Sequence, residues 1–151
     1  MFGFRSGSCR SGICSTPFIN QKAGYKHVPK AESHLLYVRD VQVTCTFYER
    51  YFGFASKIDV DDLIAELIPK DKDGGAIIMV HPAGKGIKVG QAAVKLVFDV
   101  KDVDSFKEQC MTQGLRFGIT HHADGYSFAN AKDPDGNSIS ISSRAFAVLS
   151  R

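Results

Sequence analysis

The 151-residue sequence has no tryptophan, few prolines and no long hydrophobic run. A membrane-spanning helix needs about 20 consecutive apolar residues. The longest apolar stretch in this sequence is shorter than about 18 residues, so we expect no membrane span. A Cys-x-x-Cys motif for a metal or redox centre is also missing, because the four cysteines are Cys9, Cys14, Cys45 and Cys110. A reduced, cytoplasmic protein is the simplest interpretation of this cysteine usage.

Acidic residues are absent from the first thirty positions, which contain five basic residues. The rest of the chain therefore has 14 basic and 16 acidic side chains, a net charge of −2 rather than the +3 of the whole. This balance argues against a nucleic-acid partner. Because residues 1–30 are rich in Gly, Ser and Arg and show no periodicity, we predict a flexible basic tail there and a single domain over residues 31–151.

One pattern of predicted elements occurs twice after the tail. In the first half, an apolar strand leads to Asp40, and apolar residues at helical spacing continue as far as Gly53, a natural helix stop. In the second half, the same order runs from Asp102 to Gly114. The distance from aspartate to glycine is 13 residues in one half and 12 in the other, which indicates an internal repeat.

Strand-like stretches surround each predicted helix. The first strands are 33–40 and 93–100; three more come after each helix, at 54–60, 63–68 and 76–81, and at 116–121, 126–131 and 138–142. One such half has too small a sheet to bury a core alone. We therefore predict an α+β fold in which two βαβββ modules, residues 33–82 and 93–143, form a curved eight-stranded mixed sheet around a concave pocket, with the helices outside.

Three motifs support a family resemblance. They are Leu36-Tyr37-Val38-Arg39-Asp40, Phe47-Tyr48-Glu49-Arg50-Tyr51-Phe52-Gly53-Phe54 and Asp133-Pro134-Asp135-Gly136-Asn137. With this order and spacing, the chain resembles the vicinal oxygen chelate superfamily, which includes glyoxalase I, bleomycin-resistance proteins, fosfomycin-resistance enzymes and extradiol dioxygenases. The resemblance covers about residues 33–143 and implies the two-module fold.

The resemblance also implies where a metal would be bound. Metal enzymes of this family take four ligands, usually His, Gln or Glu, from the first and last strand of each module, and these positions are here Ser33, Met79, Lys95 and Ser140. Hydroxyl, thioether and ammonium groups suit a divalent cation poorly, so we predict that the usual metal site is lost and that no cofactor is bound. Shifting the alignment with the family by one residue would put His34 in the first ligand position. That shift would also move every side chain of the strand to the opposite face of the sheet.

The same strand faces supply candidate ligand-binding residues: Ser33, Tyr37, Met79, His81, Lys95, Asp99 and Ser140. Tyr37 could stack on a ligand or belong to the core. Lys95 could bind an anion, or could reach solvent or pair with Asp99. His81 could act as a general base or simply end its strand. The alternating serines Ser138, Ser140 and Ser142 predict either a polar ligand stripe or a solvated sheet face.

Two functions are consistent with this interpretation. The first is a metal-free protein that binds a small aromatic or amphipathic organic molecule, as the bleomycin-resistance branch does by sequestration. The alternative is a divergent metal-dependent lyase, isomerase or dioxygenase with relocated ligands, for which the candidates are His34, His81, His121 and His122. The resemblance also implies a homodimer, with no nucleic-acid or membrane partner. Whether the chain is an enzyme stays open from the sequence.

Overall fold

The computed structural model describes residues 31–58, 61, 63–71 and 74–147. The chain divides into two compact units, Met1–Lys30 and Ala31–Arg151, and all of the described residues belong to the second. The predicted basic tail, residues 1–30, lies outside the described residues. None of the described helices combines the length and the apolar composition that a membrane crossing requires.

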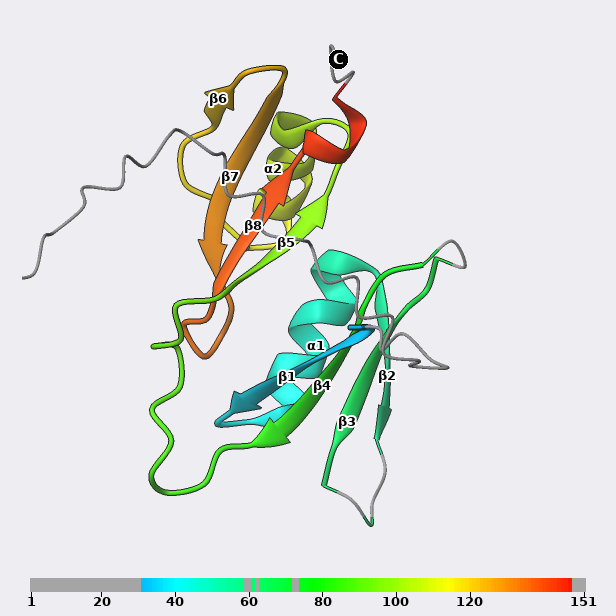
Figure 1. Ribbon diagram of the computed structural model, residues 1–151, viewed down its shortest axis with the longest axis vertical. Coiled ribbons are helices and arrows are strands. Elements are labelled where there is room, and N and C mark those ends of the chain that lie inside the picture. The colour runs from blue at the N-terminus through cyan, green and yellow to red at the C-terminus, as the bar shows by residue number, and fades with distance from the viewer. Residues whose placement is uncertain (1–30, 59–60, 62, 72–73, 148–151) are drawn as a thin grey trace, which may run out of the picture. The chain divides into compact units, whose positions relative to one another are not determined.

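Two modules with the same element order make up the described unit (Figure 1). The first contains β1 (Ser33–Val38), α1 (Val41–Phe52), β2 (Phe54–Ile58), β3 (Ala65–Pro69) and β4 (Ile77–Pro82). The second contains β5 (Lys95–Asp99), α2 (Val103–Thr112), β6 (His121–Ala123), β7 (Tyr126–Lys132) and β8 (Ser138–Ser142), followed by a 3-10 turn, Arg144–Phe146. The predicted βαβββ repeat and the α+β class are confirmed.

The helix ends agree with the repeat seen in the sequence. The Asp40 carboxylate accepts a hydrogen bond from the Val43 N–H at 3.0 Å, and Asp102 accepts one from Ser105 at 3.0 Å, which satisfies an otherwise unpaired donor at each helix start. Gly53 ends α1 with a φ of 68°, a conformation that glycine adopts at little cost. Local capping chemistry thus sets the start of both helices.

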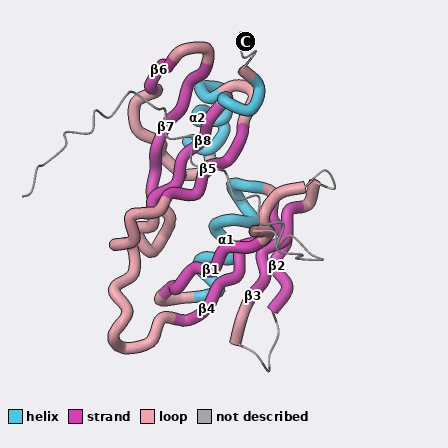
Figure 2. The backbone as a smooth tube through the Cα atoms, in the orientation of Figure 1, coloured by secondary structure: helices cyan, strands magenta, loops and turns pink. Residues whose placement is uncertain are grey.

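Each module has its own four-stranded mixed sheet, with the strands visible side by side in Figure 2. The strand order is β1-β4-β3-β2 in the first module and β5-β8-β7-β6 in the second. In both, the first and last strands pair in parallel and the other neighbours are antiparallel. The eight predicted strands therefore bond as two sheets of four, and within the described residues β1 and β5 each have a neighbour on one side only.

Strand β6 is the one element that the sequence placed wrongly. We expected a strand over 116–121, but the ladder covers only His121–Ala123. Gly118 donates a single backbone hydrogen bond to Asn130, and regular pairing with β7 begins only next to the two-residue turn at Asp124-Gly125. A tight hairpin turn stabilises only the residues next to it, so the preceding stretch is a loop.

The apolar core lies between each helix and its sheet. In the first module, α1 packs on the sheet through buried Cys45 and Tyr48, which belong to one core cluster with Val38 and Val80. Cys45 and Cys110 on the two helices are both buried and act there as small hydrophobic residues.

The Asp133–Asn137 turn between β7 and β8 contacts helix α1 of the other module. The Tyr48 hydroxyl donates to the Asp133 carboxylate at 3.1 Å, and the Thr44 hydroxyl donates to Asp135 at 3.3 Å. The Arg39 guanidinium pairs with the same Asp135 carboxylate at 2.8 Å. Two buried carboxylates therefore join the second module to the first.

Candidate functional site

Strand alternation divides the side chains of each sheet between a helix-facing side and an open face. In β1, Leu36 and Val38 contact the core beneath α1, whereas Leu35 and Tyr37 are on the other side and 42% exposed. We call the side turned away from the helix the open face of each module. Because the side-chain period of a strand is two, Ser33 shares this face with Leu35 and Tyr37, as expected.

The open face of the first module gathers four of the predicted residues. Strand β4 aligns Met79 with Leu35 and His81 with Tyr37, and Ser33 precedes them on β1. The Tyr37 and His81 rings are 5.7 Å apart in an edge-on arrangement. The predicted residues Ser33, Tyr37, Met79 and His81 therefore lie together on one half-exposed, largely apolar surface.

One ring nitrogen of His81 contacts the backbone of the next residue. Its Nδ1 lies 2.8 Å from the Pro82 carbonyl oxygen, which can only accept, so Nδ1 carries the hydrogen. The Nε2 atom of the neutral ring is then left as an acceptor. With this tautomer, His81 can accept a hydrogen bond from a ligand hydroxyl.

The open face of the second module holds the other three predicted residues. Strand β5 aligns Lys95, Val97 and Asp99 with the three serines of β8. The Lys95 ammonium donates to the Asn130 side chain at 2.7 Å, so it pairs across the sheet rather than with Asp99.

The serine stripe of β8 is mostly hidden. Ser140 and Ser142 are 4% and 5% exposed, so the interpretation as a solvated face is wrong for them. The Ser140 hydroxyl donates to the Ala129 carbonyl at 2.9 Å and is already engaged within the sheet. Small side chains here make room on the face but add little hydrogen-bonding capacity.

Sequence reasoning missed an aromatic group on this second open face. The His121 and Phe128 rings stack at 4.9 Å, and Tyr126 lies 6.3 Å beyond Phe128. The Arg144 guanidinium lies 5.5 Å above the Tyr126 ring. Alternation of Tyr126 and Phe128 along β7 was the available signal, but their face could be assigned only once β7 was paired with β8.

The residues at the four family ligand positions do not suit a metal ion. Ser33, Met79, Lys95 and Ser140 offer hydroxyl, thioether and ammonium groups, and the last two already have partners in the sheet. Among the residues that the structure describes, no three His, Cys, Asp or Glu side chains gather as a metal-binding group. The histidines are also dispersed: His34 and His81 lie on opposite faces of the first sheet, and His122 contacts Ser127 at 2.9 Å.

The Cys45 and Cys110 thiols and the Glu49 carboxylate, whose pKa values are shifted, have structural roles. Burial raises the pKa of both the Cys45 and Cys110 thiols, which keeps them protonated and unreactive. Hydrogen bonds from the Ser56 hydroxyl and backbone N–H lower the pKa of Glu49, and this contact ties α1 to β2. None of these groups lies on an open face.

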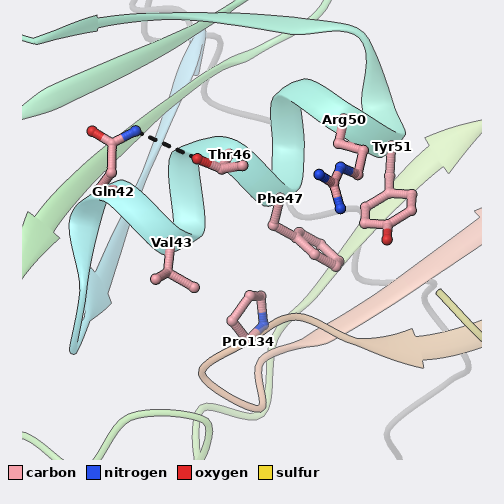
Figure 3. A pocket seen from close by; sticks show the side chains of 7 residues that line it. All are labelled: Gln42, Val43, Thr46, Phe47, Arg50, Tyr51 and Pro134. Carbon is pink, nitrogen blue, oxygen red and sulfur yellow. Dashed lines mark hydrogen bonds between the residues drawn. The ribbon is translucent and has the colours of Figure 1, made fainter. Parts of the chain in front are cut away.

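Three cavities in the described part of the chain each hold at most two of the seven predicted residues. A cavity of about 840 Å³ lies beside β5 and includes Lys95 and Asp99. A smaller one of about 380 Å³ lies on the second open face next to Asp99 and Ser142. A third, of about 340 Å³, lies over the outer surface of α1 between Val43, Phe47 and Pro134 (Figure 3) and contains none of the predicted residues.

Solved structures of similar fold include an antibiotic-binding protein and a bleomycin resistance determinant. UcmS2 superposes with a TM-score of 0.65 at 19% identity, covering 78% of this chain and 99% of that one. TnmS3, an antibiotic-binding protein from Streptomyces sp. CB03234, gives 0.61 at 20% identity, with 76% and 94% covered. The bleomycin resistance determinant encoded on transposon Tn5 gives 0.57 at 22% identity, with 76% and 96% covered.

Sequence comparison agrees with this likeness of fold. The search of curated protein sequences gave no match. A family model does match, over residues 27–141, which is most of the chain. The chain therefore belongs to the glyoxalase/bleomycin resistance protein/dioxygenase superfamily.

Proposed function

We propose that this protein binds a small aromatic or amphipathic organic molecule on the open faces of its two sheets and that it needs no metal ion to do so. The observation that carries the proposal is the surface made by Leu35, Tyr37, Met79 and His81, an exposed apolar patch with one polar ring nitrogen. Exposed apolar surface with a few convergent polar groups is typical of ligand sites.

The second open face supplies complementary groups for the same purpose. The stacked His121 and Phe128 rings offer an aromatic platform, and the ammonium of Lys95, held by Asn130, could meet an anionic or hydroxyl group of the ligand. Two similar folds belong to an antibiotic-binding protein and to a bleomycin resistance determinant. Sequestration of such a compound, without chemical change, is the activity that we infer.

The side chains at the four family ligand positions are poor ligands for a metal ion, which is why we propose binding without one. Neither the hydroxyl of Ser33 nor the ammonium of Lys95 replaces an imidazole or carboxylate ligand. Metal analysis of the purified, full-length protein should find no stoichiometric zinc, nickel, iron or manganese. A stoichiometric metal would favour instead a metal-dependent enzyme of the same superfamily with relocated ligands.

We further propose a homodimer in the cytoplasm. The family resemblance supports the dimer, since members of this superfamily often form homodimers. Buried free thiols at Cys45 and Cys110 are consistent with a reducing compartment. Sedimentation analysis of the wild-type protein tests the dimer, and fractionation of the native cells tests the location.

Ligand binding is tested by a thermal-shift screen with planar aromatic and amphipathic compounds. A ligand that raises the melting temperature should lose at least about tenfold in affinity in a Tyr37→Ala or Phe128→Ala variant, since each ring loses its contact. A Met111→Ala variant, changed at an exposed position of helix α2 on the other side of the sheet from the open face, should bind normally. A broad screen without any stabilised sample would count against the proposal.

A further inference from the structure

The cavity of about 840 Å³ lies on the helix-facing side of the sheets. Phe54 and Ile78 line it from the core of the first module, and Leu96 and Phe98 line it from β5 and pack against that same core. The cavity is therefore separate from the open faces. Ligand sites in proteins usually have volumes of about 300–1,000 Å³, so this cavity has room for a small organic molecule.

Four phenylalanine rings, each from a different helix or strand, line this cavity. The Phe52 ring of α1 lies 4.1 Å from the ring of Phe98 on β5, at an interplanar angle of 30°. The Phe54 ring of β2 lies 6.2 Å from the Phe98 ring at 79°, and the Phe106 ring of α2 lies 6.1 Å from the Phe52 ring. Offset-stacked and edge-on neighbours both stabilise an aromatic ring, so a planar aromatic molecule would find partners of both kinds here.

The outer edge of β5 adds backbone hydrogen-bonding groups to the same cavity. The Val100 N–H donates to the Ser142 carbonyl of β8 at 2.9 Å, and the residues of a strand in a parallel ladder alternate between its two sides. The N–H and C=O groups of Lys95, Val97 and Asp99 therefore point away from β8, where no described strand pairs with them. All three residues line the cavity, so a donor or acceptor on the edge of a ligand could pair with their backbone.

The charged side chains around the cavity do not favour an ion of either sign. Lys70 and Asp71, which line it at the turn after β3, are exposed neighbours of opposite charge. Lys95 and Asp99 also have opposite charges, and strand alternation directs both side chains to the open face rather than into the cavity. The groups that remain for a ligand are aromatic rings and backbone amides, which suit an uncharged molecule.

We propose that this cavity is a second ligand site, for an uncharged planar aromatic molecule that carries a hydrogen-bonding group on its edge. The rings of the molecule would pack against Phe52 and Phe98, and its polar group would pair with the outward backbone of β5. Such a ligand contacts both modules, so its binding should also raise the melting temperature. The site is distinct from the open faces and takes a different ligand class from the anionic or hydroxyl compounds that Lys95 would bind.

N-Phenyl-1-naphthylamine is a suitable probe, because it is uncharged, has two aromatic ring systems and carries one N–H group. Its fluorescence rises in apolar surroundings, so titration into the full-length protein should give a saturable signal. In nuclear magnetic resonance spectra, its ring protons should show Overhauser contacts to the Phe52 and Phe98 rings. The Val97 amide resonance should shift more than that of Phe128, which lies on the open face.

Filling the cavity from either module should weaken binding of the probe about tenfold or more. Val94→Trp, at a 68% exposed position before β5, and Ala76→Trp, before β4, each place a large ring in the lining. Met111→Trp adds the same side chain on the exposed surface of α2 and should leave the affinity unchanged. Circular dichroism checks that each variant is folded.

The open-face variants separate this site from the function proposed above. Tyr37→Ala and Phe128→Ala should bind the probe as tightly as the wild type does. Loss of the probe in these two variants, with both cavity variants binding normally, would place the probe on the open faces and overturn the cavity site alone. Absence of saturable binding to the wild type also overturns the cavity site, while the thermal-shift screen still decides the open-face function.

Discussion

The two modules share one topology, but their clusters of buried core residues differ in size. Eight buried residues form the cluster beneath α1 in the first module, whereas the corresponding cluster in the second contains only three: Val103, Ala129 and Ile141. The second module also contacts its neighbour, through the packing of Phe98 against Phe52 and through the Asp133 and Asp135 carboxylates that contact α1. A sequence repeat therefore does not imply that its copies have the same core.

The open faces differ as well. The face of the first module is mainly apolar around Leu35 and Tyr37, whereas the face of the second carries Lys95, Asn130 and a short aromatic row. The open faces of the two modules, although they share one topology, can therefore make different kinds of contact with a ligand. Single substitutions in the core, between the modules and on the open faces can test this contrast.

The largest effect is expected from the core of the first module. Leu67→Ala removes a fully buried side chain and should lower the free energy of unfolding by about 3 kcal/mol, because of lost burial and the cavity left behind. Urea unfolding measures this change. Leu35→Ala, on the exposed open face, is the control and should change stability much less. Equal losses would contradict the assignment of the two faces.

Loss of the contact between modules should come next. Asp135→Ala removes the acceptor of Arg39 and Thr44 and should cost about 2–3 kcal/mol, since hydrogen bonds to a charged group are lost and a buried hydroxyl is left unpaired. We expect hydrogen exchange to quicken in β7 and β8 more than in β1 and β4. Glu108→Ala is a matched acidic control on an exposed helix surface. Uniform destabilisation of both modules would argue against a dependent second module.

A smaller effect is expected at Tyr48. Tyr48→Phe deletes the bond to Asp133, and stability should fall by about 1 kcal/mol at neutral pH. Burial, together with the nearby Asp133 charge, raises the pKa of Tyr48. The folded state therefore holds this proton more tightly than the unfolded state, so the Tyr48 contribution is complete below about pH 10 and declines as the pH rises above it. Urea midpoints measured at rising pH should decline less steeply in Tyr48→Phe than in the wild type.

The smallest change in stability is expected on the open faces. Tyr37→Ala should alter the free energy of unfolding by no more than about 0.5 kcal/mol, since the ring is 42% exposed. Its affinity for a ligand found by screening should nevertheless fall. Comparison with Phe128→Ala would show which face contributes more, and a large loss of stability in Tyr37→Ala would assign this ring to the core instead.

Elements whose signals are local could be predicted from the sequence. The aspartate caps, the glycine after α1 and the period-two pattern of β1 each depend on a few neighbouring residues, and the structure agrees with them. The position of β6 depended on where β7 pairs, and the burial of Ser140 depended on the strands around β8. Such features are set by partners distant in sequence, which one strand's own pattern does not reveal.

By itself, the sequence determined the repeat, the two βαβββ modules, the side of each strand on which the candidate residues lie and the poor metal-ligand chemistry at four positions. These depend on capping, on strand alternation and on side-chain identity. Only the tertiary structure decided that the described strands form two sheets of four and that Lys95 pairs with Asn130. Those outcomes depend on which strands become neighbours, a choice made by packing across the whole domain rather than by local preference.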